Sequence, residues 1–279
     1  MMKLSLADLT HLKQQRQKIT MITAYDAPSA RLADAAGIDV ILVGDSAAMT
    51  VFGYDQTTAI TLEDMLLLAR AARRGASRAL LVADMPFGSV QVSDAETVSN
   101  AVRFVKEAGV DAVKIEGAGP MARRIGSVID AGIPVVGHIG LTPQSVNQLG
   151  GYKPQGRTAA AAERLLDEAG ALEQAGCVAI VLEAIPQPVA ATITRSLTIP
   201  TIGIGAGVEC DGQVLVWHDL LGLTPSKLPK FVKQYADLGS EIVKAIEAYI
   251  ADVQTGRFPE PRHTYAMPVD ERELFERKS

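Results

Sequence analysis

Short apolar runs alternate with longer helical stretches along almost the whole chain of 279 residues. The runs are rich in Val, Ile and Leu with few polar interruptions, which is typical of parallel strands covered on both faces. They predict strands at Ile19–Tyr25, Asp39–Gly44, Ala79–Asp84, Ala112–Glu116, Pro134–His138, Ala179–Glu183, Thr201–Gly205 and Gln213–His218. The stretches between them predict helices at Ala27–Ala36, Leu62–Arg74, Ala95–Ala108, Met121–Ala131, Ala159–Ala175 and Pro188–Ser196.

Ala-Gly pairs mark the turns from a helix to the next strand. Gly37, Gly109, Gly132 and Gly176 each follow an alanine at the end of a predicted helix, where glycine can adopt the left-handed conformation that closes a helix. Eight strands separated by helices, several of which end in such a pair, over roughly 200 residues favour a closed (β/α)8 TIM barrel. An open doubly wound sheet is the main rival, but no Gly-rich phosphate fingerprint follows the first strand.

A single domain accounts for residues 1–279. It comprises the barrel, a short N-terminal helix, a long amphipathic helix over Phe231–Val253 and an extended, polar tail over Phe258–Ser279. The loops Ser46–Leu62 and Gly140–Arg157 are longer than the ~2–6 residues of a typical connection from strand to helix. Because such loops lie on the catalytic face of a barrel, we expect both to cover a pocket.

Composition narrows the possible functions. The formal charge is 27 − 32 = −5, with both signs dispersed, which leaves no basic stripe for nucleic acid. No segment has the ~20 apolar residues of a membrane span, and the polar run His11–Lys18 stands where a signal peptide would be apolar. We therefore expect a cytoplasmic protein. Cys177 and Cys210 have no second Cys or His at ligand spacing, so buried thiols are expected.

Ionisable residues end five consecutive predicted strands: Asp45, Asp84, Glu116, His138 and Glu183. In a barrel these strand ends share one rim, where barrel enzymes place their active sites. A single aspartate there is equally well explained as a helix N-cap. Four carboxylates on neighbouring strands, however, repel one another strongly in a partly dry mouth, so the cluster requires a cation or protons.

The candidate ligands are all carboxylate oxygens, which favours a hard cation. A site with few protein ligands and room for water suits Mg²⁺ better than Ca²⁺. Asp45 and Asp84 are short side chains from neighbouring strands and are the best candidates for direct metal ligands. Glu116, on the next strand, can bind the metal directly or through a water molecule.

Three further side chains have predicted roles. Lys114 lies two residues before Glu116, so in a regular strand its ammonium group faces the same cavity and can hold a substrate carboxylate or a developing enolate. The apolar neighbours of Glu183 raise its pKa towards the range of a general base; a supporting carboxylate for the metal is the alternative. His138 is expected to support the site through hydrogen bonds rather than to react.

Two features near the chain's last strands are less specific. Trp217 and His218 are interpreted as structural. The glycine-rich stretch Gly203–Gly207 is compatible with a phosphate cradle or with close backbone packing near a ligand.

The order of these motifs resembles the ketopantoate hydroxymethyltransferase family over nearly the whole chain. The resemblance is carried by Thr23–Asp26, Leu42–Ser46, Asp84–Phe87, Val113–Gly117, Gly137–Gln144, Gly150–Lys153, Glu183, Ile202–Gly207 and Phe231. It implies transfer of a hydroxymethyl group from 5,10-methylenetetrahydrofolate to 3-methyl-2-oxobutanoate, giving 2-dehydropantoate for pantothenate biosynthesis. It also implies a homo-oligomer, often a decamer.

The resemblance assigns roles to individual residues. Asp45 and Asp84 would bind Mg²⁺, with Glu116 completing or supporting the site, and Asp45, Ser46, Asp84 and Lys114 would contact the oxoacid. Glu183 would be the base that forms a Mg²⁺-stabilised enolate.

Two other functions are possible for a barrel with these residues. A barrel lyase or mutase of the phosphoenolpyruvate mutase and isocitrate lyase type would use the same enolate, but no cysteine follows the third or fourth strand in Asp84–Ser89 or Gly117–Pro120. A catalytically inactive barrel is disfavoured because Asp45, Lys114 and Glu183 are all present.

Overall fold

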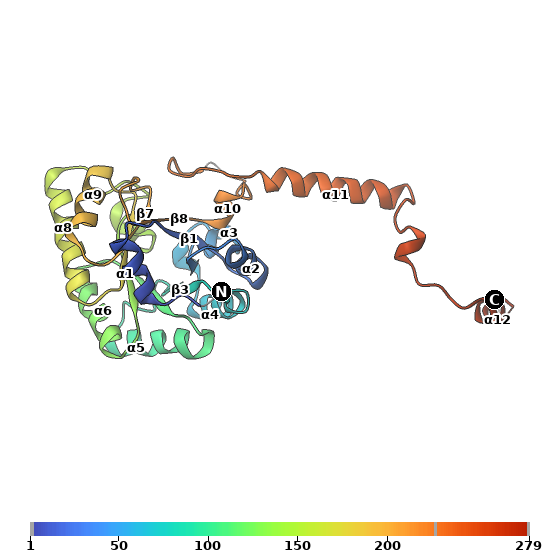
Figure 1. The fold of residues 1–279 in the computed structure, drawn as a ribbon, viewed down its shortest axis with the longest axis horizontal. Coiled ribbons are helices and arrows are strands. Elements are labelled where there is room, and N and C mark those ends of the chain that lie inside the picture. Colours follow the sequence, from blue (N-terminus) through green and yellow to red (C-terminus); the bar gives the residue numbers. More distant parts are fainter. Residues whose placement is uncertain (1–2, 226–227, 278–279) are drawn as a thin grey trace.

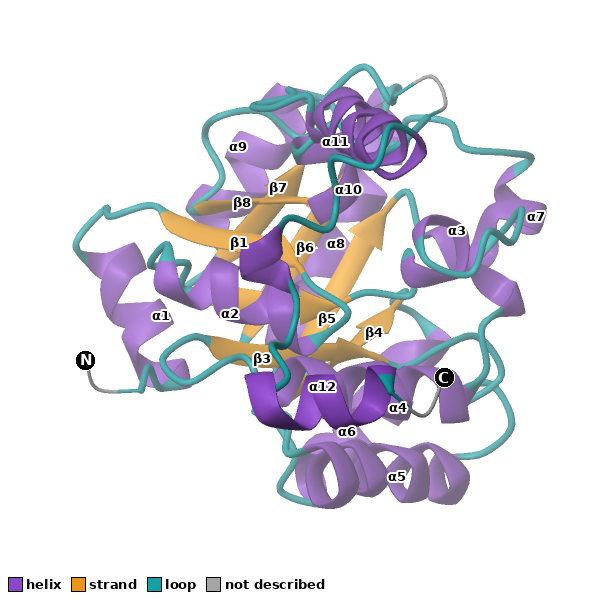
Figure 2. Cartoon of the chain, turned by 90° about the vertical axis from the view of Figure 1, so that its right-hand side faces the viewer, coloured by secondary structure: helices purple, strands orange, loops and turns teal. Residues whose placement is uncertain are grey.

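The computed structural model describes residues 3–225 and 228–277 and contains a closed barrel of parallel strands (Figure 2). Each strand pairs with the next in the chain and the eighth pairs with the first. The strands are β1 (Ile19–Thr23), β2 (Val40–Val43), β3 (Leu80–Asp84), β4 (Ala112–Glu116), β5 (Val135–Gly140), β6 (Ala179–Glu183), β7 (Thr201–Ile204) and β8 (Gly212–Leu215). The predicted (β/α)8 barrel is confirmed, and the open doubly wound sheet is wrong.

Six helical segments cover the outside of the barrel. They are α2 (Ala27–Ala35), α4 (Leu62–Arg73), α5 (Asp94–Arg103) continued as the π-helical η2 (Phe104–Ala108), α6 (Pro120–Asp130), α8 (Ala159–Gln174) and α9 (Gln187–Ser196). Gly37, Gly109, Gly132 and Gly176 all have positive φ angles, as predicted for the residues that close the helices. Residues 205–211 return from β7 to β8 without a helix. The larger apolar core lies between the strands and this layer of helices.

Inside the barrel, inward-facing residues follow a period of two. Leu80 and Val82 on β3 belong to a separate core cluster, as do Val136 on β5 and Val181 on β6. Helix α1 (Leu6–Gln14) covers this cluster at the amino-terminal ends of the strands, where Leu9 packs against it. The strands appear uniformly apolar in sequence because both faces are buried, yet only alternate residues line the interior.

The loops after β2 and β5 contain short helices. Residues 46–62 include α3 (Ala47–Thr50) and η1 (Thr57–Ala59), and residues 140–157 include η3 (Pro143–Ser145) and α7 (Val146–Leu149). Both loops follow the carboxyl ends of their strands, on the face where barrel active sites lie.

Two boundaries near the C-terminus differ clearly from the prediction. β8 ends at Leu215, and Trp217–Leu220 forms the short helix α10 instead of continuing the strand, because the Trp217 amide donates to Thr23 Oγ1 (2.9 Å). The long helix, α11, spans Leu238–Gln254 rather than starting at Phe231. Up to that point the backbone pairs with the end of α10, through Tyr235 N to Leu220 O (2.8 Å).

The predicted extended tail is partly helical, with η4 (Pro261–His263) and α12 (Val269–Glu276). Acidic residues Asp270 and Glu271 in the first turn of α12 and an ion pair between Arg272 and Glu276 (2.7 Å) favour the helix. Lys278 and Ser279 of the predicted tail lie outside the described residues. Among those described, no helix is long and apolar enough to cross a membrane.

Helix α11 and the segments after it point away from the barrel (Figure 1). No residue of α11 is buried, although much of its surface is apolar. Its exposed large apolar residues are Leu238, Ile242, Val243, Ile246, Tyr249, Ile250 and Val253. A helix with so much apolar surface is normally covered in the functional state.

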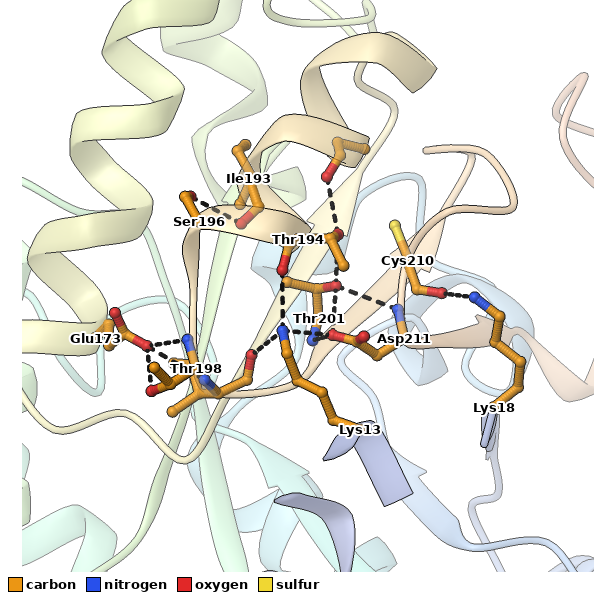
Figure 3. Close-up of polar contacts among 12 residues, drawn as sticks. Lys13, Lys18, Glu173, Ile193, Thr194, Ser196, Thr198, Thr201, Cys210 and Asp211 are labelled. Atoms are coloured by element: carbon orange, nitrogen blue, oxygen red, sulfur yellow. Dashed lines mark hydrogen bonds and ion pairs between the residues drawn. The ribbon is translucent and has the colours of Figure 1, made fainter. Parts of the chain in front are cut away.

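At the amino-terminal ends of the strands, Lys13 on α1 forms hydrogen bonds with three other segments (Figure 3). Its ammonium group donates to the carbonyls of Thr194 (3.0 Å) and Ile199 (2.9 Å) and to Asp211 Oδ2 (2.9 Å). Asp211 Oδ2 also accepts from the backbone amide of Thr201 at the start of β7 (2.9 Å). Lys13 therefore fastens α1 to the end of α9 and to the start of β7.

We expect Lys13→Met to lower the free energy of unfolding by about 1–3 kcal/mol, because it leaves the half-buried Asp211 and two carbonyls without their shared donor. Urea denaturation measures the change. Lys106→Met, at an exposed position of η2, is the matched control. Equal stability of the two variants would contradict a clamping role for Lys13.

Candidate active site

Strand register brings the predicted site residues to one end of the barrel. Asp84 on β3 is opposite Lys114 on β4, and Glu116 is opposite His138 on β5. These site residues occupy the next inward-facing position of their strands. On β3, Asp84 follows the inward-facing Leu80 and Val82, and on β6, Glu183 follows Ala179 and Val181. An ionisable layer therefore lies directly above the apolar interior.

Asp45 reaches this layer by a different route. Val40 and Leu42 of β2 face inwards, so the next inward position falls on Gly44. A Cβ atom on Gly44 would lie 2.8 Å from Ser46 Oγ and 3.6 Å from Asp84 Oδ2, which leaves no room for a side chain. Asp45, one residue later, is buried, and its backbone amide donates to Asp84 Oδ2 (2.9 Å).

Lys114 supplies the positive charge at the centre of this layer. Its Nζ lies 2.9 Å from Asp84 Oδ1 and 3.9 Å from Glu116 Oε1. These three side chains are only 3–4% exposed, so water screens their interactions weakly. Burial alone would lower the pKa of Lys114, but the negative charges of Asp84, Glu116 and Asp45 outweigh it and raise the pKa.

His138 connects Lys114 to Glu183. Lys114 Nζ lies 3.1 Å from His138 Nδ1, and His138 Nε2 lies 3.2 Å from Glu183 Oε2. Burial and the Lys114 charge lower the pKa of His138, which favours the neutral ring. Because an ammonium group can only donate, Nδ1 accepts and the ring proton lies on Nε2, the nitrogen nearer to Glu183.

Glu183 is the most accessible carboxylate of the cluster, with 14% of its side chain exposed. Its strand end is fixed by the neighbouring loop, since the Leu141 amide donates to the Glu183 carbonyl (2.9 Å). A Cβ atom on Gly140 would lie 2.3 Å from that carbonyl oxygen. Ala184 directly after it has a φ angle of 47°, an uncommon conformation for a residue with a side chain and one found most often at functional sites.

Burial raises the pKa values of three carboxyl groups in the layer. For Asp45 the pKa lies well above its usual range, through burial and then the charge of Asp84. For Glu116 burial raises the pKa to about 7, with Lys114 opposing the rise. For Glu183 burial again raises the pKa, and His138 opposes it. Four carboxyl groups thus lie around one ammonium group, and burial opposes the ionisation of three of them.

Two contacts in the site were not predicted from the sequence. Gln144, in the loop after β5, donates from Nε2 to Asp45 Oδ2 (2.9 Å). Tyr25, after β1, shares a hydrogen bond with Ser46 Oγ (2.9 Å). Both residues lie in segments that carry the family resemblance, but their partners are distant in sequence, so no local pattern could identify them.

The residues fit a hard divalent cation, but they do not form a closed cage. Among the described residues, no three His, Cys, Asp or Glu side chains form a ready-made metal cluster. Buried Asp84 Oδ1 and Glu116 Oε1 are paired with the Lys114 ammonium group (2.9 and 3.9 Å) and accept no further hydrogen bond among the described residues. Mg²⁺ usually takes one or two protein carboxylates and keeps several water molecules, so an open pair such as Asp45 and Asp84 suits it. Direct binding by Glu116 stays a prediction.

The two long loops meet above the carboxylates. Tyr152 Oη lies 3.9 Å from Met49 Sδ, joining the loop after β5 to the loop after β2. Burial raises the pKa of Tyr152, and the charges of Asp45 and Glu183 raise it further. The loops therefore meet at the strand ends that carry the carboxylates; that they cover a pocket stays a prediction.

Residues outside the cluster support the barrel. The stretch Gly203–Gly207 serves close packing: a Cβ atom on Gly205 would lie 2.7 Å from Phe231 Cδ1, and one on Gly207 would lie 2.5 Å from Gln187 Cγ. His218 packs against Tyr25, with ring centroids 5.5 Å apart. Cys177 and Cys210 are buried free thiols, as predicted.

Comparisons with known proteins identify the class and then the family. The fold is that of a phosphoenolpyruvate phosphomutase from Streptomyces platensis subsp. rosaceus (TM-score 0.61, 18% identity, 99% of this chain and 96% of that one). A phosphonopyruvate hydrolase solved with oxalate and Mg²⁺ is also similar (TM-score 0.60, 12% identity, covering 99% and 97%). With a polar layer at the carboxyl ends of its strands, the chain is a (β/α)8-barrel enzyme of this architecture.

Sequence relatives are more specific. Residues 3–261 match the profile of the ketopantoate hydroxymethyltransferase family. The 3-methyl-2-oxobutanoate hydroxymethyltransferase of Carboxydothermus hydrogenoformans is 55% identical over 265 residues, 95% of this chain and 96% of that protein. The enzyme of the same name from Geobacillus kaustophilus is 53% identical over 264 residues, 95% of each. The chain belongs to the ketopantoate hydroxymethyltransferase family. The lyase or mutase alternative thus shares the fold but not the family, and the inactive-barrel alternative is wrong.

The raised pKa of Glu116 makes stability depend on pH. Its pKa is about 7 in the folded protein against an ordinary 4.5, so between these values the folded state holds a proton that the unfolded state has lost. The free energy of unfolding therefore falls as pH rises through this window. In urea denaturation with a chelator present, we expect Glu116→Gln to reduce the fall between pH 5 and pH 7.5. An unchanged fall would contradict the raised pKa.

Proposed function

We propose that this chain transfers a hydroxymethyl group from 5,10-methylenetetrahydrofolate to 3-methyl-2-oxobutanoate, giving 2-dehydropantoate. Family membership supports the reaction, and the accessible Glu183 beside the His138–Lys114 pair is the observation that supports the mechanism. The first step is removal of the proton on C3 of the oxoacid, for which the site needs a base and a means of stabilising the enolate charge.

Mg²⁺, when bound by Asp45 and Asp84 with support from Glu116, would supply Lewis acidity towards the 2-oxoacid. The remaining chemistry belongs to protein side chains. Lys114 is the cation of the layer, and its buried ammonium group can attract the negative charge that develops on the substrate oxygens. Ser46, half-buried, next to Asp45 in the chain and hydrogen-bonded to Tyr25, would contact the oxoacid.

Glu183 acts as the base in this proposal. Its greater exposure supports access by the substrate, and its raised pKa brings it closer to the range of an effective general base. His138, whose Nε2 lies 3.2 Å from Glu183 Oε2, would orient the carboxylate. The C3 proton passes to Glu183 and the C–H electron pair moves into the enolate. Water hydrolyses the methylene group of the folate to formaldehyde and releases tetrahydrofolate; the enolate C3 then attacks the formaldehyde carbon, and the formaldehyde oxygen takes up a proton to become the hydroxyl group.

We expect Glu183→Gln to retain oxoacid binding in the presence of Mg²⁺ but to lose exchange of the C3 proton in deuterated water by at least 100-fold, because the amide cannot accept the proton. Proton NMR of 3-methyl-2-oxobutanoate measures the exchange. Glu168→Gln, a half-buried glutamate on α8 outside the site, is the control. Exchange at the wild-type rate in Glu183→Gln would eliminate Glu183 as the base.

We also infer that the protein self-associates through α11. The exposed apolar residues of this helix have no partner within the described part of the chain, apart from Tyr249, which packs edge-on against Phe258 (5.7 Å). Burying such a surface against another copy would stabilise an assembly at about 25 cal/mol per Å². A homo-oligomer, and a decamer in particular, agrees with the family resemblance.

Ile246, 53% exposed at the centre of α11, provides the test of this assembly. We expect Ile246→Asp to shift the molar mass in light scattering towards the monomer, because a charge would be buried in the interface. Glu247→Gln, at the adjacent exposed position, should keep the assembly. If Ile246→Asp has the wild-type mass, α11 does not mediate self-association.

A further inference from the structure

Gln144 bonds to three strand ends at once. It lies in η3, in the loop after β5, and is only 6% exposed. Its side-chain amide donates to Asp45 Oδ2 (2.9 Å), after β2, and to the Met85 carbonyl (3.0 Å), after β3. Its backbone amide donates to Glu116 Oε2 (3.0 Å), at the end of β4. Gln144 thus contacts two of the three proposed metal ligands.

We propose that Gln144 is a positioning residue that holds Asp45 ready to bind the divalent cation. The proposal rests on the metal site of the proposed function. Lys114 fixes Asp84 at 2.9 Å but Gln144 provides the hydrogen bond to the Asp45 carboxylate, which is displaced from the regular strand series by Gly44. Without this bond, the Asp45 side chain would be oriented by the attraction of Lys114 and the repulsion of Asp84 and Glu116, with no directional hydrogen bond from Gln144.

An amide suits this position for two reasons. It offers two N–H donors on one nitrogen, which match the carboxylate of Asp45 on one side and the Met85 carbonyl on the other. It is also neutral, so it orients Asp45 without cancelling the negative charge that attracts a cation. A lysine or arginine there would balance that charge and compete with the metal. Outer hydrogen bonds of this kind typically change metal affinity 10- to 100-fold.

A substitution that removes the side-chain N–H donors of Gln144 but keeps its backbone amide tests the side-chain bonds to Asp45 and Met85 alone. Gln144→Met keeps a similar length and leaves the backbone bond to Glu116 possible. Manganese(II), followed by electron paramagnetic resonance, is the probe for the metal. We expect Gln144→Met to weaken Mn²⁺ binding about 10- to 100-fold. In the assay, the Mg²⁺ concentration for half-maximal activity should rise, while kcat at saturating Mg²⁺ returns towards the wild-type value.

Gln148→Met, an exposed glutamine of α7 four residues away, is the matched control and should keep Mn²⁺ affinity within about twofold. Unchanged affinity in Gln144→Met, or an equal loss in Gln148→Met, would overturn the role of Gln144. If the wild-type protein itself binds no Mn²⁺, the metal site of the proposed function fails instead.

A measurement on the unmodified protein covers the case in which Gln144→Met does not fold. With ¹⁵N-glutamine labelling, Mn²⁺ should broaden the side-chain amide signal of Gln144 at a concentration that leaves that of Gln148 sharp. Equal broadening of both signals would place the metal away from Gln144 and overturn the proposal.

Discussion

Four carboxyl groups share one ammonium group at the dry end of this barrel, and the arrangement of the site follows from that imbalance. Asp45, Asp84, Glu116 and Glu183 all lie close to Lys114, where water screens charge weakly. Burial raises the pKa values of Asp45, Glu116 and Glu183, which favours their neutral forms, and Lys114 pairs with Asp84. The remaining negative charge is what a divalent cation would neutralise.

The alternation of side chains along the barrel strands brings these carboxyl groups together. A period of two along β3, β4, β5 and β6 puts apolar residues inside the barrel and ionisable ones in the next layer up. Gly44 breaks the series on β2 and moves the carboxylate to Asp45. At the other end, α1 and Lys13 close the barrel, so the polar layer is confined to the face covered by the long loops.

The sequence was sufficient for the features that depend on local pattern. Strand ends predicted the clustering of Asp84, Lys114, Glu116, His138 and Glu183, because the ends of parallel strands in a barrel must meet. Gln144 and Tyr25 could not be predicted, since their roles depend on partners brought together only by the closed barrel. Gln144 and Asp45, for instance, are 99 positions apart. The start of α11 could not be predicted for a similar reason: the backbone amides of Tyr235 and Leu238 donate to the carbonyls of Leu220 and Leu221 at the end of α10.

Transfer of a labelled carbon tests the account most directly. The purified protein would be incubated with 3-methyl-2-oxobutanoate, Mg²⁺ and methylenetetrahydrofolate carrying ¹³C in its methylene group, and the products followed by ¹³C NMR. The account predicts a hydroxymethyl signal from 2-dehydropantoate that disappears when a chelator replaces Mg²⁺ and returns when Mg²⁺ is restored. Absence of the labelled product, or a rate unaffected by the chelator, would contradict it.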